Sequence, residues 1–94
     1  MGGMDEVTLQ ERFIANVERM LLDLGWKVID DTGRVICTGR SRLAHAMQAT
    51  PQLVTDYLNG RSSPGLGVIA RFAEALGVDP HELLMEPASE TVAA

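Results

Sequence analysis

Four polar residues recur at helical spacing near the middle of the chain: Gln52, Thr55, Asp56 and Asn59. At about 100° per residue they form one stripe along a helix. The opposite side of that helix is apolar, with Leu53, Val54, Tyr57 and Leu58. Amides and hydroxyls can donate and accept hydrogen bonds at the edges of base pairs, and one amide can make two such bonds to an adenine. The pattern is typical of a short helix that reads DNA.

The residues around this stripe predict where the helix begins and ends. Thr50 can accept the free backbone N–H groups at a helix start, and Pro51 suits the first turn because its missing N–H needs no partner there. Gly60 can take the left-handed conformation that ends a helix. A second helix is predicted over residues 40–47, with a turn at Gln48. Residues 40–60 are therefore interpreted as two helices joined by a tight turn.

A longer helix is predicted before this motif, from a capping box at Thr8 and Glu11 to Gly25. Its predicted inner face holds Leu9, Phe13, Val17, Met20, Leu21 and Leu24. Leu22 falls on the polar side, which suggests that another element covers this helix. Residues 26–38 are the predicted cover: two β-prone runs around Asp31-Thr32-Gly33 form a hairpin, in which Cys37 is expected to be buried.

Two further helices are predicted after the motif. Residues 66–76 place Leu66, Ile69, Phe72, Ala73 and Leu76 inward. Asp79 and Glu82 form a second capping box that opens a short helix through Met85. The single domain is predicted to span residues 8–86, with a disordered start or cloning remnant at 1–7 and a disordered tail at 87–94.

A series of residues between positions 39 and 84 occurs in a recognisable order: Leu43, Ala44, Thr50, Val54, Asn59, Gly60, Pro64, Ile69, Phe72, Ala73, Ala75, Leu76, Gly77, Val78, Glu82, Leu83 and Leu84. At this spacing the segment resembles the lambda-repressor-like (Xre/Cro-type) helix-turn-helix family. The resemblance implies a mostly α-helical, five-helix DNA-binding domain. The chain departs from the family in two places. The hairpin 26–38 is inserted between the first and second helices, and Gln48 stands where the family typically has glycine.

The resemblance also implies roles for individual residues. Helix 51–59 would enter the major groove, with Gln52 and Thr55 facing bases. Asp56 shares their stripe, and it either accepts a hydrogen bond from a cytosine amino group or pairs with Arg42 or Arg61. The predicted phosphate-binding residues are Arg40, Arg42, Asn59, Arg61 and Ser63.

The charge of the chain bears on this interpretation. Its net charge is −5, whereas DNA-binding domains usually carry a basic face. However, residues 34–72 hold five arginines against Asp56 alone, and the remaining residues hold three basic residues against twelve carboxylates. This distribution favours a DNA-facing side in the middle of the chain, and it predicts weak affinity per subunit.

These observations predict a sequence-specific double-stranded DNA-binding transcriptional regulator of repressor type. It would act as a homodimer in a bacterial cytoplasm, encoded by the bacterium or a phage. Residues 82–85 and the hairpin are the two predicted dimer surfaces, and the first follows the habit of the family. Two alternatives stay open: the antitoxin of a toxin–antitoxin pair, and a protein-interaction module that has lost DNA binding.

Other function classes find little support in the residues. His45 and His81 lie beside no acid–nucleophile pair, so an enzyme is not expected. Cys37 is the single cysteine, which excludes an internal disulfide, and nothing resembles a metal-ligand spacing. No cofactor is therefore predicted. No apolar run approaches the roughly 20 residues of a membrane span.

Overall fold

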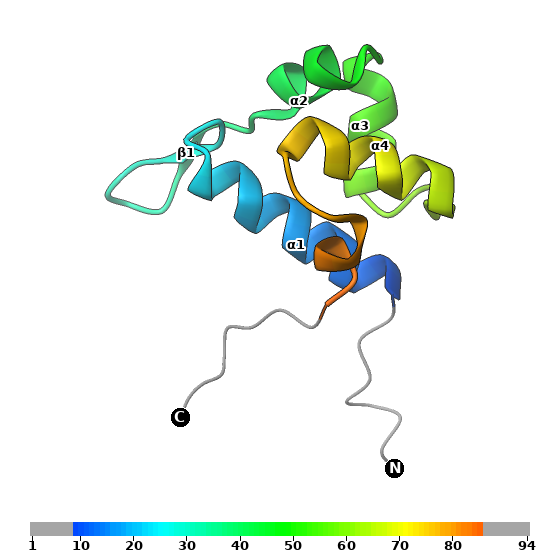
Figure 1. Cartoon of the computed structure of the whole chain (residues 1–94). Coiled ribbons are helices and arrows are strands. Elements are labelled where there is room, and N and C mark those ends of the chain that lie inside the picture. The colour runs from blue at the N-terminus through cyan, green and yellow to red at the C-terminus, as the bar shows by residue number, and fades with distance from the viewer. Residues whose placement is uncertain (1–8, 86–94) are drawn as a thin grey trace, which may run out of the picture.

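The fold is a small helical domain with a hairpin at one end of its first helix (Figure 1). This computed structural model describes residues 9–85. Its elements are α1 (Leu9–Asp23), β1 (Val28–Ile29), β2 (Val35–Cys37), α2 (Arg40–Met47), α3 (Pro51–Leu58), α4 (Leu66–Leu76) and the 3-10 helix η2 (Pro80–Leu83). The mostly α-helical class and the hairpin between the first two helices are confirmed. The predicted disordered ends, 1–7 and 87–94, lie outside the described residues.

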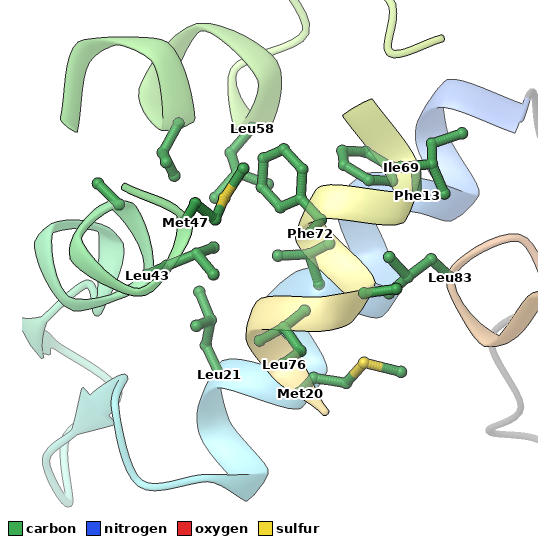
Figure 2. Close-up of a cluster of buried hydrophobic side chains, with 14 residues drawn as sticks. Phe13, Met20, Leu21, Leu43, Met47, Leu58, Ile69, Phe72, Leu76 and Leu83 are labelled. Atoms are coloured by element: carbon green, nitrogen blue, oxygen red, sulfur yellow. The ribbon is translucent and has the colours of Figure 1, made fainter. Parts of the chain in front are cut away.

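One core joins all four α-helices and η2 (Figure 2). Its centre is Phe72 of α4, whose ring stands edge-on to Phe13 of α1 with centroids 4.9 Å apart. Tyr57 of α3 packs edge-on to the same ring at 6.0 Å. Aromatic pairs prefer this arrangement because the positive edge of one ring meets the negative face of the other. Phe72 therefore packs against both α1 and α3.

The predicted inner faces are correct except at Leu9, Leu24 and Leu66, which are exposed. Leu9 and Leu66 are the first residues of α1 and α4, and they are 61% and 81% exposed. Both lie beyond the point where other helices pack. Leu24 follows the last residue of α1, so helical periodicity no longer directs its side chain, and it is exposed too.

The predicted fifth α-helix is instead the 3-10 helix η2. Its backbone bonds span three residues, from Glu82 N–H to Asp79 C=O at 2.9 Å and from Leu84 N–H to His81 C=O at 3.0 Å. The capping box of Asp79 and Glu82 is present. The buried Asn16 of α1 donates through Nδ2 to the carbonyls of Leu83 and Met85, at 2.9 and 2.8 Å. Side-chain contacts from α1 thus bind the last backbone carbonyls of this segment. The prediction of five α-helices is therefore wrong: the domain has four α-helices and a 3-10 turn within the described residues.

The hairpin forms but does not cover α1. Its strands are antiparallel, with Val28 opposite Cys37, and an irregularity in register separates the two residue pairs. All strand residues are exposed, so the prediction that Cys37 is buried is wrong. Leu22 also stays exposed. The sheet has two strands, and Figure 1 shows the loop projecting from the end of α1 rather than folding back along it.

The hairpin turn is held by one carboxylate. Asp30 Oδ1 accepts hydrogen bonds from the Thr32 hydroxyl at 2.6 Å, the Thr32 N–H at 2.9 Å and the Arg34 N–H at 3.0 Å. The Thr32 hydroxyl, and next the Arg34 N–H, favour the charged form and lower the pKa of Asp30 below its usual value of 3.8. The turn is therefore set by Asp30, which precedes the three residues predicted to form it.

Candidate nucleic-acid interface

The turn between α2 and α3 brings two short helices together at a sharp angle. Gln48, at the predicted turn, ends α2 in the left-handed conformation with φ at 58°. Among the described residues other than glycine, it alone has a positive φ. Thr50 then begins α3 as predicted, because its hydroxyl accepts the N–H of Leu53 at 3.2 Å. Both ends of the turn are capped locally, so the orientation of α3 follows from this short segment.

A close backbone approach sets the start of α2. Gly39 is its N-terminal cap with φ at 78°. A Cβ atom there would lie 3.0 Å from the carbonyl carbon and oxygen of Trp26. A side chain at this position would therefore force α2 away from the base of the hairpin.

The outer side of α3 is open, and its inner side packs on the core. Val54 and Leu58 are buried. Gln52 and Asn59 are exposed, and Thr55 and Asp56 are half-buried. The structure thus places the predicted polar stripe along one accessible side of α3. In the monomer, no other described element packs over it closely enough to bury it.

Three of the predicted site residues form a bonded group on this side. Asp56 Oδ1 accepts a hydrogen bond from Gln52 Nε2 at 2.9 Å, one helical turn earlier. Arg61 Nη1 lies 3.8 Å from the same oxygen, and its side chain is 70% exposed. Asp56 therefore pairs with Arg61, which is one of the two arginines predicted for it.

Arg42, the other predicted partner of Asp56, lies elsewhere. Its guanidinium stacks over the indole ring of Trp26, 4.9 Å from the ring centroid. Such cation–π contacts hold a positive charge without neutralising it. Trp26 is half-buried against the core, and it also supports this arginine.

A second bonded group forms where α1, α2 and α3 meet. Arg40, the first residue of α2, donates from Nη1 to Asn59 Oδ1 at 3.1 Å and from Nη2 to Glu18 Oε2 at 3.2 Å. Lys27 Nζ donates to the other oxygen of Glu18 at 2.9 Å. The structure thus joins two predicted phosphate-binding residues, Arg40 and Asn59, through a contact between side chains.

Two residues of this region were not found by sequence reasoning. Glu18 belongs to the polar side of α1 and carries no sequence signal for a contact 22 positions away. Gln10 of α1 donates to the carbonyls of Gly60 and Ser62 at 3.2 and 3.1 Å, which holds the loop after α3. Ser63 is exposed in that loop. Both contacts join distant parts of the chain, so only the fold reveals them.

The described part of the chain offers little for other chemistry. Across residues 9–85, no group of three or more His, Cys, Asp or Glu side chains is placed to hold a metal ion. Within the same residues, no helix has the length and apolar character needed to cross a membrane.

Comparison with known proteins gives one match. No curated protein and no solved structure is detectably similar to the chain. The helix-turn-helix domain family matches residues 36–84, which is just over half of the chain and contains α2, α3, α4 and η2. Domains of this kind are typical of DNA-binding proteins that are not enzymes. With the turn between α2 and α3 inside the matched segment, the chain belongs to the helix-turn-helix domain family.

Proposed function

We propose that the protein is a sequence-specific double-stranded DNA-binding transcriptional regulator of the lambda-repressor-like (Xre/Cro) type. The observation that carries this proposal is the division of α3 into a buried apolar side and an accessible polar side bearing Gln52. A helix of this form fits the major groove, where base edges present donors and acceptors.

Base reading would rest on Gln52 and Thr55. Gln52 has both a donor and an acceptor and can form two hydrogen bonds with an adenine. In the free protein its amide is held by Asp56, so its orientation is restricted before DNA arrives. Asp56 would act mainly by holding Gln52 and Arg61, because a carboxylate at the groove is repelled by phosphates. Thr55 can contact a thymine methyl group.

Positioning on the duplex would come from the ends of α2 and α3. Arg42, Arg61 and Ser63 are exposed on this part of the molecule and suit phosphate oxygens, and Arg40 and Asn59 belong to the same rim. Such contacts fix register and carry no sequence information directly. Because the acidic flanks oppose binding, the affinity of one subunit should be low and strongly dependent on salt.

A homodimer would supply the missing affinity. One eight-residue helix spans only a few base pairs, so two copies on paired half-sites about one helical turn apart are needed for a specific site. We place the dimer contact at the C-terminal apolar surface, which comprises Leu9, Leu66, Ile69 and Leu84. These four residues line one apolar hollow, and Leu9 and Leu66 are exposed there.

The alternative is a module that binds a partner protein, such as the toxin of an antitoxin. The observation that favours it is the uncovered hairpin, where Ile36 is 65% exposed together with Val28, Ile29 and Val35. An interaction of this apolar surface would respond weakly to salt, whereas DNA binding should weaken steeply as salt rises.

Selection from random duplex DNA tests the proposal. The wild-type chain should enrich a two-fold symmetric site at low salt. Gln52→Ala should relax the preference at one position of each half-site, because a good amide–adenine contact contributes about 1–3 kcal/mol of discrimination. Gln48→Ala removes the same group outside the stripe and should leave the preference unchanged. The absence of any enriched sequence at low salt would favour the interaction module instead.

A further inference from the structure

Arg40 occupies a position that a simple phosphate contact does not explain. It is the first residue of α2, yet its side chain is only 23% exposed. One terminal nitrogen donates to Asn59 and the other to Glu18. Glu18 is itself shared with Lys27. Both terminal nitrogens of Arg40 are thus bonded inside the protein, while its Nε is buried without a partner, and the guanidinium connects α1, α2 and the end of α3.

The contact with Asn59 has only one possible polarity. A guanidinium has donors and no acceptor, so the atom of Asn59 that faces it must be the carbonyl oxygen. The amide is planar, and its NH2 group is therefore on the side away from Arg40. Asn59 is exposed, so this group is accessible. Arg40 determines which end of the amide is available to a ligand.

The position of Asn59 gives this orientation a consequence. Asn59 is the C-terminal cap of α3. The C-terminal end of a helix carries a partial negative charge, which disfavours a phosphate. An outward NH2 group places two hydrogen-bond donors at that end, and a phosphate oxygen can accept hydrogen bonds from them. An unrestrained asparagine would present its oxygen there as often as its nitrogen.

We propose that Arg40 is a positioning residue, which orients the Asn59 amide so that Asn59 donates to a DNA phosphate, and that Glu18 holds Arg40 in place for this purpose. The inference rests on the proposed DNA binding and deepens it. It assigns the phosphate contact to Asn59, and it gives Arg40 a role through Asn59 instead of a direct charge contact.

Charge-conserving substitution separates the two roles. Arg40→Lys keeps the positive charge but cannot reach Glu18 and Asn59 with a rigid fork. Asn59→Ala should weaken binding to the selected duplex roughly 3- to 10-fold, the range for one lost hydrogen bond. Arg40→Lys should weaken it by a similar factor without changing the salt dependence. The double variant should bind no more weakly than Asn59→Ala, because both changes remove one contact.

Arg19→Lys is the matched control, since Arg19 is an exposed arginine of α1 outside the interface, and it should bind like the wild type. Wild-type affinity in Arg40→Lys would overturn the proposal, and so would losses that multiply in the double variant. If the wild type itself binds no duplex at low salt, the proposed DNA binding is wrong. If the wild type binds and Arg40→Lys binds equally well, only the positioning role of Arg40 is wrong.

A measurement without DNA tests the orientation directly. In the free protein, the side-chain NH2 resonances of Asn59 should be distinct from those of an unrestrained amide, and Arg40→Lys should shift them toward the unrestrained position. Far-UV circular dichroism and thermal melting of each variant establish that it is folded. Asn59 resonances that stay in place in folded Arg40→Lys would overturn the orienting role.

Discussion

At the residue scale, Asp56 places a negative charge on the polar side of α3, the side that we propose faces DNA. It is the only carboxylate between residues 34 and 72, and the structure places it between Gln52 and Arg61. The hydrogen bond from Gln52 at 2.9 Å is short, whereas the ion pair with Arg61 at 3.8 Å is long and exposed. Exposed pairs of this kind contribute about 0–1 kcal/mol. In the proposed complex the carboxylate would also repel DNA phosphates, so we expect it to lower the affinity for DNA.

Replacing that carboxylate tests its effect. Asp56→Asn keeps an oxygen that can accept from Gln52 and removes the negative charge. Affinity for random-sequence duplex at low salt should rise about fivefold, corresponding to roughly 1 kcal/mol for two charges about 4 Å apart in water. Fluorescence anisotropy of a labelled duplex measures this change. Asp31→Asn, in the hairpin turn, removes the same charge away from α3 and should have little effect. A loss of affinity in Asp56→Asn would contradict this prediction and show that the carboxylate supports binding, either by contacting DNA or by holding Arg61.

At the scale of the elements, the turn between α2 and α3 carries a backbone cost. Gln48 is exposed and holds φ at 58°, a conformation that costs a residue with a Cβ about 1 kcal/mol more than glycine. The turn is nevertheless well formed, because Gln48 and Ala49 donate their N–H groups to carbonyls of α2. The geometry of the motif is therefore retained without its usual glycine.

A glycine at this position should stabilise the domain. Gln48→Gly is expected to raise the free energy of unfolding by about 0.5–1 kcal/mol, which shifts Tm upward by several degrees. Gln48→Ala removes the same side chain and keeps the strain, so its Tm should not rise. Thermal denaturation followed by circular dichroism compares the two variants. An equal rise in both would attribute the effect to the glutamine side chain and not to the backbone.

The hairpin shows how far local patterns determine an element. Its β-prone runs predict strands, and strands form, but they cover only Val28–Ile29 and Val35–Cys37. The turn is anchored locally by Asp30. Whether a hairpin packs on a helix depends on the direction in which it leaves that helix, and here Leu22 and Ile36 both remain exposed. That direction is a tertiary property, and the sequence pattern does not contain it.

At the scale of the whole molecule, two apolar surfaces are left uncovered. The C-terminal apolar surface lies at the start of α1 and α4 and includes Leu66, which is 81% exposed. The hairpin surface lies at the opposite end of α1 (Figure 1). Exposed apolar groups of this size are unfavourable in water unless a partner covers them. In the proposed homodimer, contact at one of these surfaces would leave the other open to a second protein.

A pair of matched substitutions distinguishes these surfaces. Leu66→Asp should convert the wild-type dimer to a monomer in sedimentation velocity, because a charge cannot be buried in the contact without a partner. Ile36→Asp introduces the same charge at the hairpin and should leave the dimer intact. The reverse result would place the dimer contact at the hairpin. A monomeric wild type at high concentration would contradict the proposed homodimer.

The amino-acid sequence by itself determined those features that depend on neighbouring residues. Thr50 and Pro51 began α3, the turn after α2 fell at Gln48, and the polar stripe from Gln52 to Asn59 lay on one side of the helix. Each follows from backbone stereochemistry or helical periodicity over a few positions. For the same reason, the boundaries of α2 and α4 were predicted correctly.

Only the tertiary structure decided which distant groups meet. Asn16 bonds the end of η2, the 3-10 turn that stands where a fifth α-helix was expected, and Glu18 and Asn59 share Arg40. Leu9 and Leu66 have the spacing of core residues but lie past the edge of the packed helices. Contacts between residues that are distant in the sequence depend on how the helices cross and where they end. The residue pattern of a single helix contains neither of these.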